Sequence, residues 1–336
     1  MIKIFTPYNK NLVYGNFSTA TRYAQLLNIY HLKSIVETNF LNANRIKKGD
    51  LVFVLHAFKG YKIVKMCKER MIPCVLVITG TDLYKNLEND HIEIKKKCVF
   101  SIKNSSAIIV LNKNAAHDLY EKVKVREKKV FVIYQSVAVN SKKTIFFKNK
   151  SSYSVLMVGN IRQEKDYFTG IQGFLSAFPN GINDYGQKIY LNHIGGVLDY
   201  RYFLELLTKI NKSNIIFHGT KLTNDTHQIM KSSDLLLHPS SIEGGSLVIS
   251  EALNINLPII ASDISCHRSI LGKNFNGLFK MGNFEDLGLK LSSFFKSETF
   301  RNSMEQQMFK NTLRSYTNLS EANELLEVVS FLKYKA

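Results

Sequence analysis

Short apolar runs alternate with amphipathic stretches through the first half of the chain. The apolar runs are rich in β-branched residues and end in polar clusters, as buried strands do. Between two of them, residues 59–71 place Ile63, Val64, Cys67 and Met71 on one arc with lysines opposite, a helical period. We predict strands at residues 2–6, 51–55, 74–78, 107–111 and 130–133. This alternation is typical of a parallel sheet with right-handed crossovers.

A second alternation follows residues 137–152, which lack a clear period and are predicted to connect two domains. Leu287, Leu291 and Phe295, at spacing four, predict helix after residue 284, and a last helix is expected near 320–334. The predicted strands are residues 154–158, 188–194, 215–218, 234–237 and 258–262. We therefore expect an α/β protein with domains at residues 1–150 and 151–317, since 336 residues exceed one comfortable core.

The most informative stretch is residues 238–251, a strand end followed by a glycine-rich turn and a helix. Gly244 and Gly245 are expected to open a helix whose free N–H groups can bind an anion. Glu243 precedes the turn and Glu251 lies about two turns along the same side. This pattern suits a ligand with hydroxyls flanking a diphosphate, such as a nucleotide sugar. An ordinary strand–turn–helix crossover with surface glutamates is the alternative.

With seven residues between them, Glu243 and Glu251 resemble the EX7E motif of retaining glycosyltransferases of family 4. The resemblance implies the GT-B fold, two facing Rossmann-like domains with parallel sheets and an interdomain cleft. It implies that Glu243 lies by the transferred sugar and Glu251 holds the nucleotide ribose. It also places Gly244, Gly245, Ser246 and Leu247 in donor binding. In that fold the last helix, residues 318–336, packs back on the first domain.

Two further loops fit the same family. Arg162 and Lys165 match the basic pair aimed at the donor diphosphate, and Gly195 and Gly196 follow a predicted strand as further donor-binding residues. An arginine fork and a lysine point charge can stabilise a leaving diphosphate. Because the sequence has no Asp-x-Asp, no metal and no cofactor besides the donor substrate is expected.

A narrower resemblance concerns the selenosugar synthases of selenoneine biosynthesis. It rests on Thr-Gly-Thr-Asp-Leu-Tyr at 79–84 and on matches spread over residues 15–280, while residues 160–164 and those after 281 match poorly. It implies a UDP-N-acetylglucosamine donor and a selenophosphate acceptor. Besides Glu243, the catalytic candidates are His56 and Asp82. The acceptor or phosphate-binding candidates are Gly15, Asn16, Thr19, Arg22, Thr81, Tyr84, Gln135 and Ser136.

Charge is distributed unevenly. Residues 1–150 hold 27 lysines and arginines against 10 acids, a net charge of +17, whereas the remainder has a net charge of +1. The first half should therefore meet something anionic. A family-4 transferase acting on a lipid or surface glycan is the second hypothesis, with basic amphipathic stretches 59–71 and 91–103 contacting an anionic membrane. A basic nucleic-acid-binding protein is a third, but no finger, zipper or RNA motif supports it, and no nucleic-acid partner is expected.

The compartment is expected to be cytoplasmic. Cys67, Cys74, Cys98 and Cys266 show no CxxC spacing and are predicted to be free thiols. No apolar run approaches the roughly 20 residues that span a bilayer, and the N-terminus lacks signal-peptide features.

Overall fold

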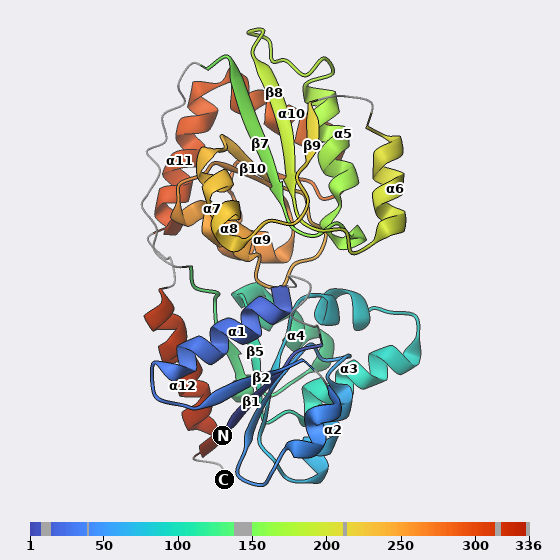
Figure 1. Cartoon of the computed structure of the whole chain (residues 1–336), viewed down its shortest axis with the longest axis vertical. Helices are drawn as coiled ribbons and strands as arrows, with labels where there is room; N and C mark the ends of the chain where they lie inside the picture. The colour runs from blue at the N-terminus through green and yellow to red at the C-terminus, as the bar shows by residue number, and fades with distance from the viewer. Residues whose placement is uncertain (8–14, 39, 138–149, 211–213, 313–316, 334–336) are drawn as a thin grey trace. The chain divides into compact units, whose positions relative to one another are not determined.

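The computed structural model describes residues 1–7, 15–38, 40–137, 150–210, 214–312 and 317–333. By their contacts the residues form two compact units (Figure 1). Unit 1 comprises Met1–Ala138, Glu243–Gly245 and Tyr316–Ala336, and unit 2 comprises Val139–Ile242 and Ser246–Ser315. Each unit contains one six-stranded sheet in which every pairing is parallel. The α/β class predicted from the alternating pattern is confirmed.

The sheet of unit 1 has the strand order β2-β1-β3-β4-β5-β6. Its strands are β1 (Ile2–Phe5), β2 (Ser34–Glu37), β3 (Leu51–Leu55), β4 (Cys74–Val77), β5 (Ala107–Val110) and β6 (Val130–Val132). Alternate residues point to opposite faces of a strand, so Val75 and Val77 join one core cluster while Leu76 joins another. Both faces of the sheet are therefore buried, as parallel sheets require.

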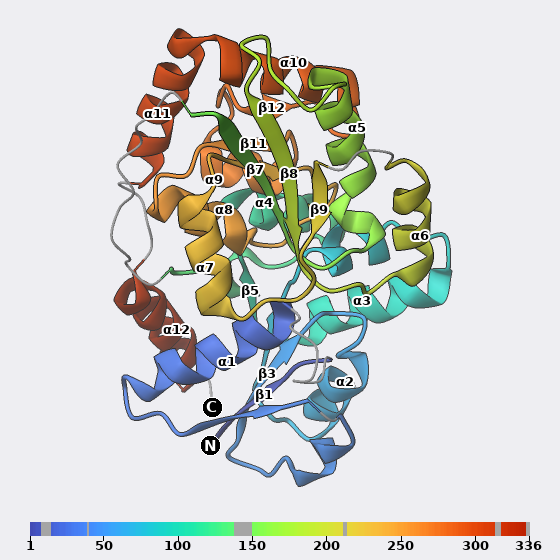
Figure 2. The same cartoon turned by 45° about the horizontal axis from the view of Figure 1, so that its top comes forward.

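Helices cover both faces of this sheet. On one side, α1 (Gly15–Asn28) and α12 (Asn318–Lys333) lie side by side, as Figures 1 and 2 both show, and share a core cluster. The other side is covered by α2 (Tyr61–Glu69), α3 (Ile92–Asn104) and α4 (Lys113–Val123). Three short turns, η1 (Phe40–Arg45), η2 (Asp82–Asn86) and η3 (Glu127–Lys129), complete the described part of unit 1.

The sheet of unit 2 has the order β12-β11-β10-β7-β8-β9. Its strands are β7 (Ser152–Val158), β8 (Lys188–Ile194), β9 (Ile215–Phe217), β10 (Leu235–His238), β11 (Ile259–Ser262) and β12 (Leu278–Phe279). Its helices are α5 (Tyr167–Ala177), α6 (Tyr200–Thr208), α7 (Thr223–Ser232), α8 (Leu247–Asn254), α9 (Ser265–Leu271), α10 (Phe284–Lys296) and α11 (Glu298–Thr312), with the turn η4 (Gln163–Lys165). One continuous apolar cluster runs through both faces.

Some details differ from the sequence predictions. Helix α8 begins at Leu247 rather than at Gly244, because Gly244 and Gly245 lie in a bend and Ser246 adopts φ +42°. Strands β2 and β12 were not predicted. The predicted connection at 137–152 falls mostly on residues outside the described ranges, as do those just before α12, so the domain boundaries near 150 and 317 stay predictions. Within the described ranges no helix is long and apolar enough to cross a bilayer.

Candidate active site

Two loops at the carboxyl end of the sheet in unit 2 are joined through their backbones. The loop after β7 and the loop after β8 meet where Ile161 N donates to Gly196 O at 2.8 Å and Gly196 N donates to Asn160 Oδ1 at 2.9 Å. Gly195 has φ +151°, and a Cβ added there would lie 2.0 Å from Gly159 O. Only glycine allows this approach. Gly195 and Gly196, predicted as donor-binding residues, therefore also shape the loop that carries the basic pair.

The basic pair predicted from sequence lies in that loop. Arg162 precedes the turn η4, and Lys165 closes it with 9% of its surface exposed. The Nε atom of Arg162 is buried and has no hydrogen-bond partner. A buried, unpaired charged donor is costly unless something binds it. This nitrogen is therefore suited to receive an anionic ligand.

Hydrogen bonds tie the same turn to the loop after β10. Ser241 donates to Glu164 O through its backbone N at 2.9 Å and its Oγ at 3.3 Å. At the end of β10, before that loop, His238 Nε2 lies 3.1 Å from Ser246 Oγ and thereby holds the residue that precedes α8. Within unit 2, the basic turn and the start of α8 are thus positioned by one continuous set of contacts. Leu247, the first helical residue of α8, has the predicted place at the helix N-terminus.

Glu251 lies on α8 and has a partner that the sequence did not suggest. Its Oε1 is 3.1 Å from His227 Nε2 on α7, and both side chains are partly exposed. The hydrogen bond to Glu251 raises the pKa of His227 above 6.5, against an opposing effect of burial. His227 therefore fixes one carboxylate oxygen of Glu251 and leaves the other oxygen for a ligand.

His193 was also missed, and its role is structural. It is fully buried on β8, its Nε2 is 2.8 Å from Gly159 O, and its ring packs edge-on against Tyr167 at 4.6 Å. Burial lowers the pKa of His193 to about 4. The neutral ring thus supports the loop after β7 and is not available as an acid at neutral pH.

In unit 1, His56 and Thr81 meet at the carboxyl ends of β3 and β4. His56 Nε2 lies 3.2 Å from Thr81 Oγ1, and His56 adopts φ +78°, an unusual conformation for a non-glycine residue. Burial lowers the pKa of His56, although the nearby Asp82 opposes this. The neutral imidazole of His56, held in a strained backbone conformation at the ends of these strands, therefore stays a predicted substrate-contacting group.

Asp82 and Tyr84 both have hydrogen-bond partners within unit 1. The carboxylate of Asp82 is fully buried and accepts hydrogen bonds from the backbone N atoms of Ala57 (3.0 Å), Thr79 (2.9 Å) and Leu83 (3.2 Å). Tyr84 donates its hydroxyl to Asp118 Oδ2 at 2.7 Å. The contacts of Asp82 position the turn that carries Thr81, and Tyr84 joins that turn to α4. The catalytic role of Asp82 and the phosphate-binding role of Tyr84 stay predictions.

Four of the acceptor candidates belong to a buried network between α1 and α12. Arg22 Nε pairs with both oxygens of Glu321, at 3.2 and 3.3 Å, and Glu321 Oε2 also accepts from Ser136 N at 2.8 Å. Gln135 Nε2 donates to Thr19 Oγ1 at 2.9 Å, and that hydroxyl donates to Gly15 O at 2.9 Å. Glu321 offsets the charge of Arg22, whose Nη2 is buried without a hydrogen-bond partner, and the phosphate-binding role of these residues stays a prediction.

The remaining candidates lie at two chain turns. Gly15 and Asn16 are the first residues of α1, and residues 8–14 before them are outside the described ranges. Gly244 is grouped with unit 1, where its carbonyl accepts from Asn112 Nδ2 at 2.8 Å; a Cβ on Gly244 would lie 2.5 Å from Thr79 O. Gly244 is thus held within unit 1 by one hydrogen bond and by its close approach to Thr79. The roles of Glu243 beside the transferred sugar and of Gly244 and Gly245 in donor binding stay predictions. Asn112, which also caps α4, was missed.

Metal-binding side chains are not clustered in the described part of the chain. Among the residues that the structure describes, no three His, Cys, Asp or Glu side chains are grouped so that they could hold a metal ion. The four cysteines are buried free thiols.

Comparison of the sequence with known protein families identifies the family of this chain. Residues 139–311 match the family model of glycosyl transferases group 1, and the match contains Arg162, Lys165 and Glu251. The chain belongs to the group 1 glycosyltransferases. It is thus an enzyme that transfers a sugar from a nucleotide sugar, as the EX7E spacing had indicated.

Relatives of this glycosyltransferase support the same reading. The chain is 27% identical over 292 residues to an uncharacterized glycosyltransferase of Methanocaldococcus jannaschii, covering 82% of this chain and 76% of that protein. It is 22% identical over 275 residues to an Escherichia coli UDP-Gal:alpha-D-GlcNAc-diphosphoundecaprenol alpha-1,3-galactosyltransferase, covering 78% and 67%.

Solved structures show that this glycosyltransferase has the GT-B fold. Anabaena Alr3699/HepE, crystallised with UDP and glucose, superposes with a TM-score of 0.76 at 14% identity, over 98% of this chain and 99% of that one. Sucrose-phosphate synthase of Thermosynechococcus elongatus gives a TM-score of 0.77 at 12% identity, over 100% and 99%. The GT-B fold, with two six-stranded parallel sheets, is confirmed.

Proposed function

We propose that this glycosyltransferase takes a UDP-linked sugar as its donor, binds it on unit 2, and transfers the sugar with retention to a hydroxyl of a lipid-linked or surface glycan. The observation that carries the proposal is the buried, unpartnered Nε of Arg162, in the turn next to Lys165. The presence of UDP with Anabaena HepE and the UDP-sugar named for the Escherichia coli relative support the choice of nucleotide.

The chemistry follows from where charge develops. When the bond between the sugar and the diphosphate breaks, negative charge builds on the leaving diphosphate. Arg162 can offer two parallel N–H groups to it, Lys165 adds a second positive charge, and the N-terminus of α8 contributes its free N–H groups. Fixed donors of this kind stabilise developing charge without reorganisation. No metal is needed in this scheme.

The two glutamates have separate parts. Glu251, oriented by His227, is proposed to accept hydrogen bonds from the ribose hydroxyls through its other oxygen. Glu243 is proposed to lie by the transferred sugar and to stabilise positive charge that develops on it. Removing Glu251 should thus weaken donor binding, whereas removing Glu243 should mainly slow turnover.

The choice of a glycan acceptor rests on Arg22. The buried carboxylate of Glu321 is bound by Arg22 Nε and Ser136 N and offsets the charge of Arg22, although Arg22 Nη2 is buried without a hydrogen-bond partner. A highly charged phosphate analogue therefore gains less from this cluster than from an unpaired arginine. The Escherichia coli relative is named for an acceptor that carries N-acetylglucosamine on a diphospholipid. A hydroxyl acceptor of that class fits a site around His56 and Thr81, which holds one neutral imidazole and one hydroxyl.

A second candidate is transfer of N-acetylglucosamine from its UDP form to selenophosphate. Two observations favour it: the Thr-Gly-Thr-Asp-Leu-Tyr segment at 79–84, and the net charge of +17 in residues 1–150. A small, highly charged acceptor is attracted to a basic domain.

One assay separates the candidates. Purified enzyme is incubated with UDP-N-acetylglucosamine, UDP-galactose or UDP-glucose, and with either a short diphospholipid-linked N-acetylglucosamine in micelles or freshly prepared selenophosphate under reducing, oxygen-free conditions. Products are identified by mass spectrometry, and Glu243→Ala is run beside the wild type. We expect a glycan product in the lipid arm that Glu243→Ala reduces about 100-fold or more. A selenium-bearing sugar instead would overturn the glycan acceptor, and no UDP release with any pair would count against both candidates.

A further inference from the structure

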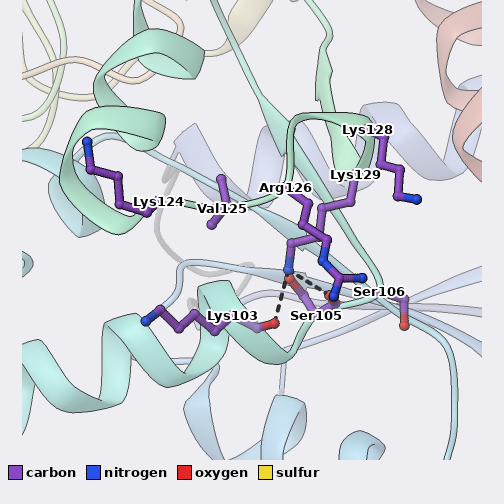
Figure 3. Close-up of a pocket in the computed structure, with 8 residues that line it drawn as sticks. All are labelled: Lys103, Ser105, Ser106, Lys124, Val125, Arg126, Lys128 and Lys129. Atoms are coloured by element: carbon purple, nitrogen blue, oxygen red, sulfur yellow. Dashed lines mark hydrogen bonds between the residues drawn. The ribbon is translucent and has the colours of Figure 1, made fainter.

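Unit 1 contains a strongly basic cavity away from the residues discussed so far. It has a volume of about 500 Å³, and its lining includes Lys103, Lys124, Arg126, Lys128 and Lys129, with two serines and one valine (Figure 3). The cations come from the ends of α3 and α4 and from the turn η3. A cavity of this size can hold a small ligand.

The cavity lies at the opposite edge of the sheet from the candidate active site. Ser106 and Lys129 line it, and they directly precede β5 and β6. His56, Thr81 and Ser136 follow the carboxyl ends of β3, β4 and β6. Since all strands of this sheet are parallel, the two groups of residues lie at opposite ends of the strands. The cavity therefore cannot be a part of the sugar-transfer site in unit 1.

Most of the positive charge in the cavity is not neutralised. Among the described residues, no carboxylate lies within 4 Å of a side-chain nitrogen of Lys103, Arg126 or Lys128, and Lys124 has one exposed partner, Glu121 at 3.8 Å. The C-terminal ends of α3 and α4 offset about half a charge each. The group still carries a clear positive excess, which suits an anion.

Lys129 makes the cavity partly preformed. Its Nζ donates to the carbonyls of Ile102 at 2.8 Å, Lys103 at 3.1 Å and Ser105 at 3.1 Å, as the dashed lines in Figure 3 show for Lys103 and Ser105. These bonds tie η3 to the end of α3. The backbone that carries Arg126 and Lys128 is thereby fixed against the backbone that carries Lys103.

We propose that this cavity binds a compact soluble anion with two or more phosphate groups, such as a short polyphosphate or a doubly phosphorylated sugar. Arg126 supplies a fork for two phosphate oxygens, and the lysines supply point charges. No aromatic side chain lines the cavity, which disfavours a nucleotide base. The one apolar residue in the lining, Val125, is partly buried, which disfavours insertion into a membrane at this cavity.

The test uses variants with the same change in charge. All proteins carry Arg162→Ala and Lys165→Ala, so that the candidate donor site contributes no phosphate binding. The cavity variant adds Arg126→Gln and Lys128→Gln, and the control adds Lys95→Gln and Lys96→Gln on the exposed side of α3. Tripolyphosphate and pyrophosphate are titrated into each by calorimetry at fixed ionic strength. Vesicles of phosphatidylglycerol are tested in parallel by flotation.

We expect one tripolyphosphate to bind per chain, tighter than pyrophosphate, with about a tenfold or greater loss of affinity in the cavity variant and less than about twofold in the control. Equal losses of affinity in both variants would mean that overall charge explains the binding, and would overturn the proposed site. If neither tripolyphosphate nor pyrophosphate binds, the proposed site is overturned as well. Vesicle binding that requires Arg126 and Lys128, without binding of the free anions, would assign the cavity to a lipid head group and overturn the soluble ligand.

Discussion

Glu324 on α12 is a single residue whose environment opposes its charge. Its Oε2 is buried without a hydrogen-bond partner. Burial, followed by the negative charges of Glu321 and Glu327, raises its pKa from 4.5 to about 7. An acid with a raised folded-state pKa destabilises the fold as the pH rises from about 4.5 through 7.

Glu324→Gln should therefore stabilise the protein above neutral pH. We expect a gain of about 1–2 kcal/mol in the free energy of unfolding at pH 8, after allowance for solvent screening of a partly exposed side chain, and almost none at pH 4.5. Chemical denaturation at the two pH values measures this, with Glu305→Gln on the exposed side of α11 as control. A loss of stability at pH 8 would show that the charged form is bound by a partner.

His227 gives a pH dependence of the opposite kind. Its pKa is raised above 6.5 by the hydrogen bond to Glu251, so the pair stabilises the fold fully below about pH 6.5, and this contribution disappears as the pH rises through the folded-state pKa. His227→Asn should cost about 0.5–1 kcal/mol at pH 6 and little at pH 8.5. His117→Asn on the exposed side of α4 serves as control. An equal cost at both pH values would mean that packing, rather than the charged pair, explains the effect.

Single residues also show where sequence reasoning ends. The spacing of Glu243 and Glu251, and that of Arg162 and Lys165, could be read because each pair lies within one local motif. His227 could not be identified, because it lies 24 positions from Glu251 in the sequence and contacts it only where α7 packs against α8. The pairing of Arg22 with Glu321 joins residues 299 positions apart and could not be identified for the same reason.

At the scale of elements, Gly195 decides whether the loops after β7 and β8 can meet. Gly195→Ala places a Cβ 2.0 Å from Gly159 O and also forces alanine to φ +151°. We expect the loop that carries Arg162 to shift and donor affinity to fall about tenfold or more, with a loss of stability of about 2 kcal/mol or more. Gly272→Ala, at φ +91° with open space around it, is the matched control for backbone strain alone.

The two glycine variants are compared by donor titration and by thermal unfolding. If Gly272→Ala lowers donor affinity as much as Gly195→Ala, the effect comes from overall destabilisation. If neither variant affects donor affinity, the loop after β8 does not position the basic pair.

Elements with a strong pattern were predicted within a few residues, and weak ones were not. β8 was predicted at its observed bounds because it combines a β-rich run with a glycine stop. β2 was not predicted, because all four of its residues are only partly buried and its sequence contains no apolar run of the kind that marks a buried strand. The start of α8 was placed too early, since Ser246 adopts φ +42°, which a sequence does not reveal for serine.

At the scale of the whole molecule, two parallel sheets follow from two rounds of strand and helix alternation, and the family match confirms the chemistry that the EX7E spacing indicated. The two halves of the chain have similar folds but very different net charges, since +17 of the net charge of +18 lies in residues 1–150. The sugar-transfer proposal uses little of that charge, because the basic pair for the diphosphate lies in unit 2. The cavity beside η3 offers a physical reason for part of the rest.

The central claim is that unit 2 binds a nucleotide sugar through Arg162 and Glu251. The most direct measurement is calorimetric titration of UDP-N-acetylglucosamine, UDP-galactose and UDP-glucose. Each donor is titrated into the wild type, into Arg162→Ala and Glu251→Ala, and into the exposed control Lys273→Ala. The account predicts that at least one donor binds one to one, that each site variant weakens it about tenfold or more, and that the control stays within about twofold. Unchanged affinity in both site variants, or no binding of any of these donors to the wild type, would contradict it.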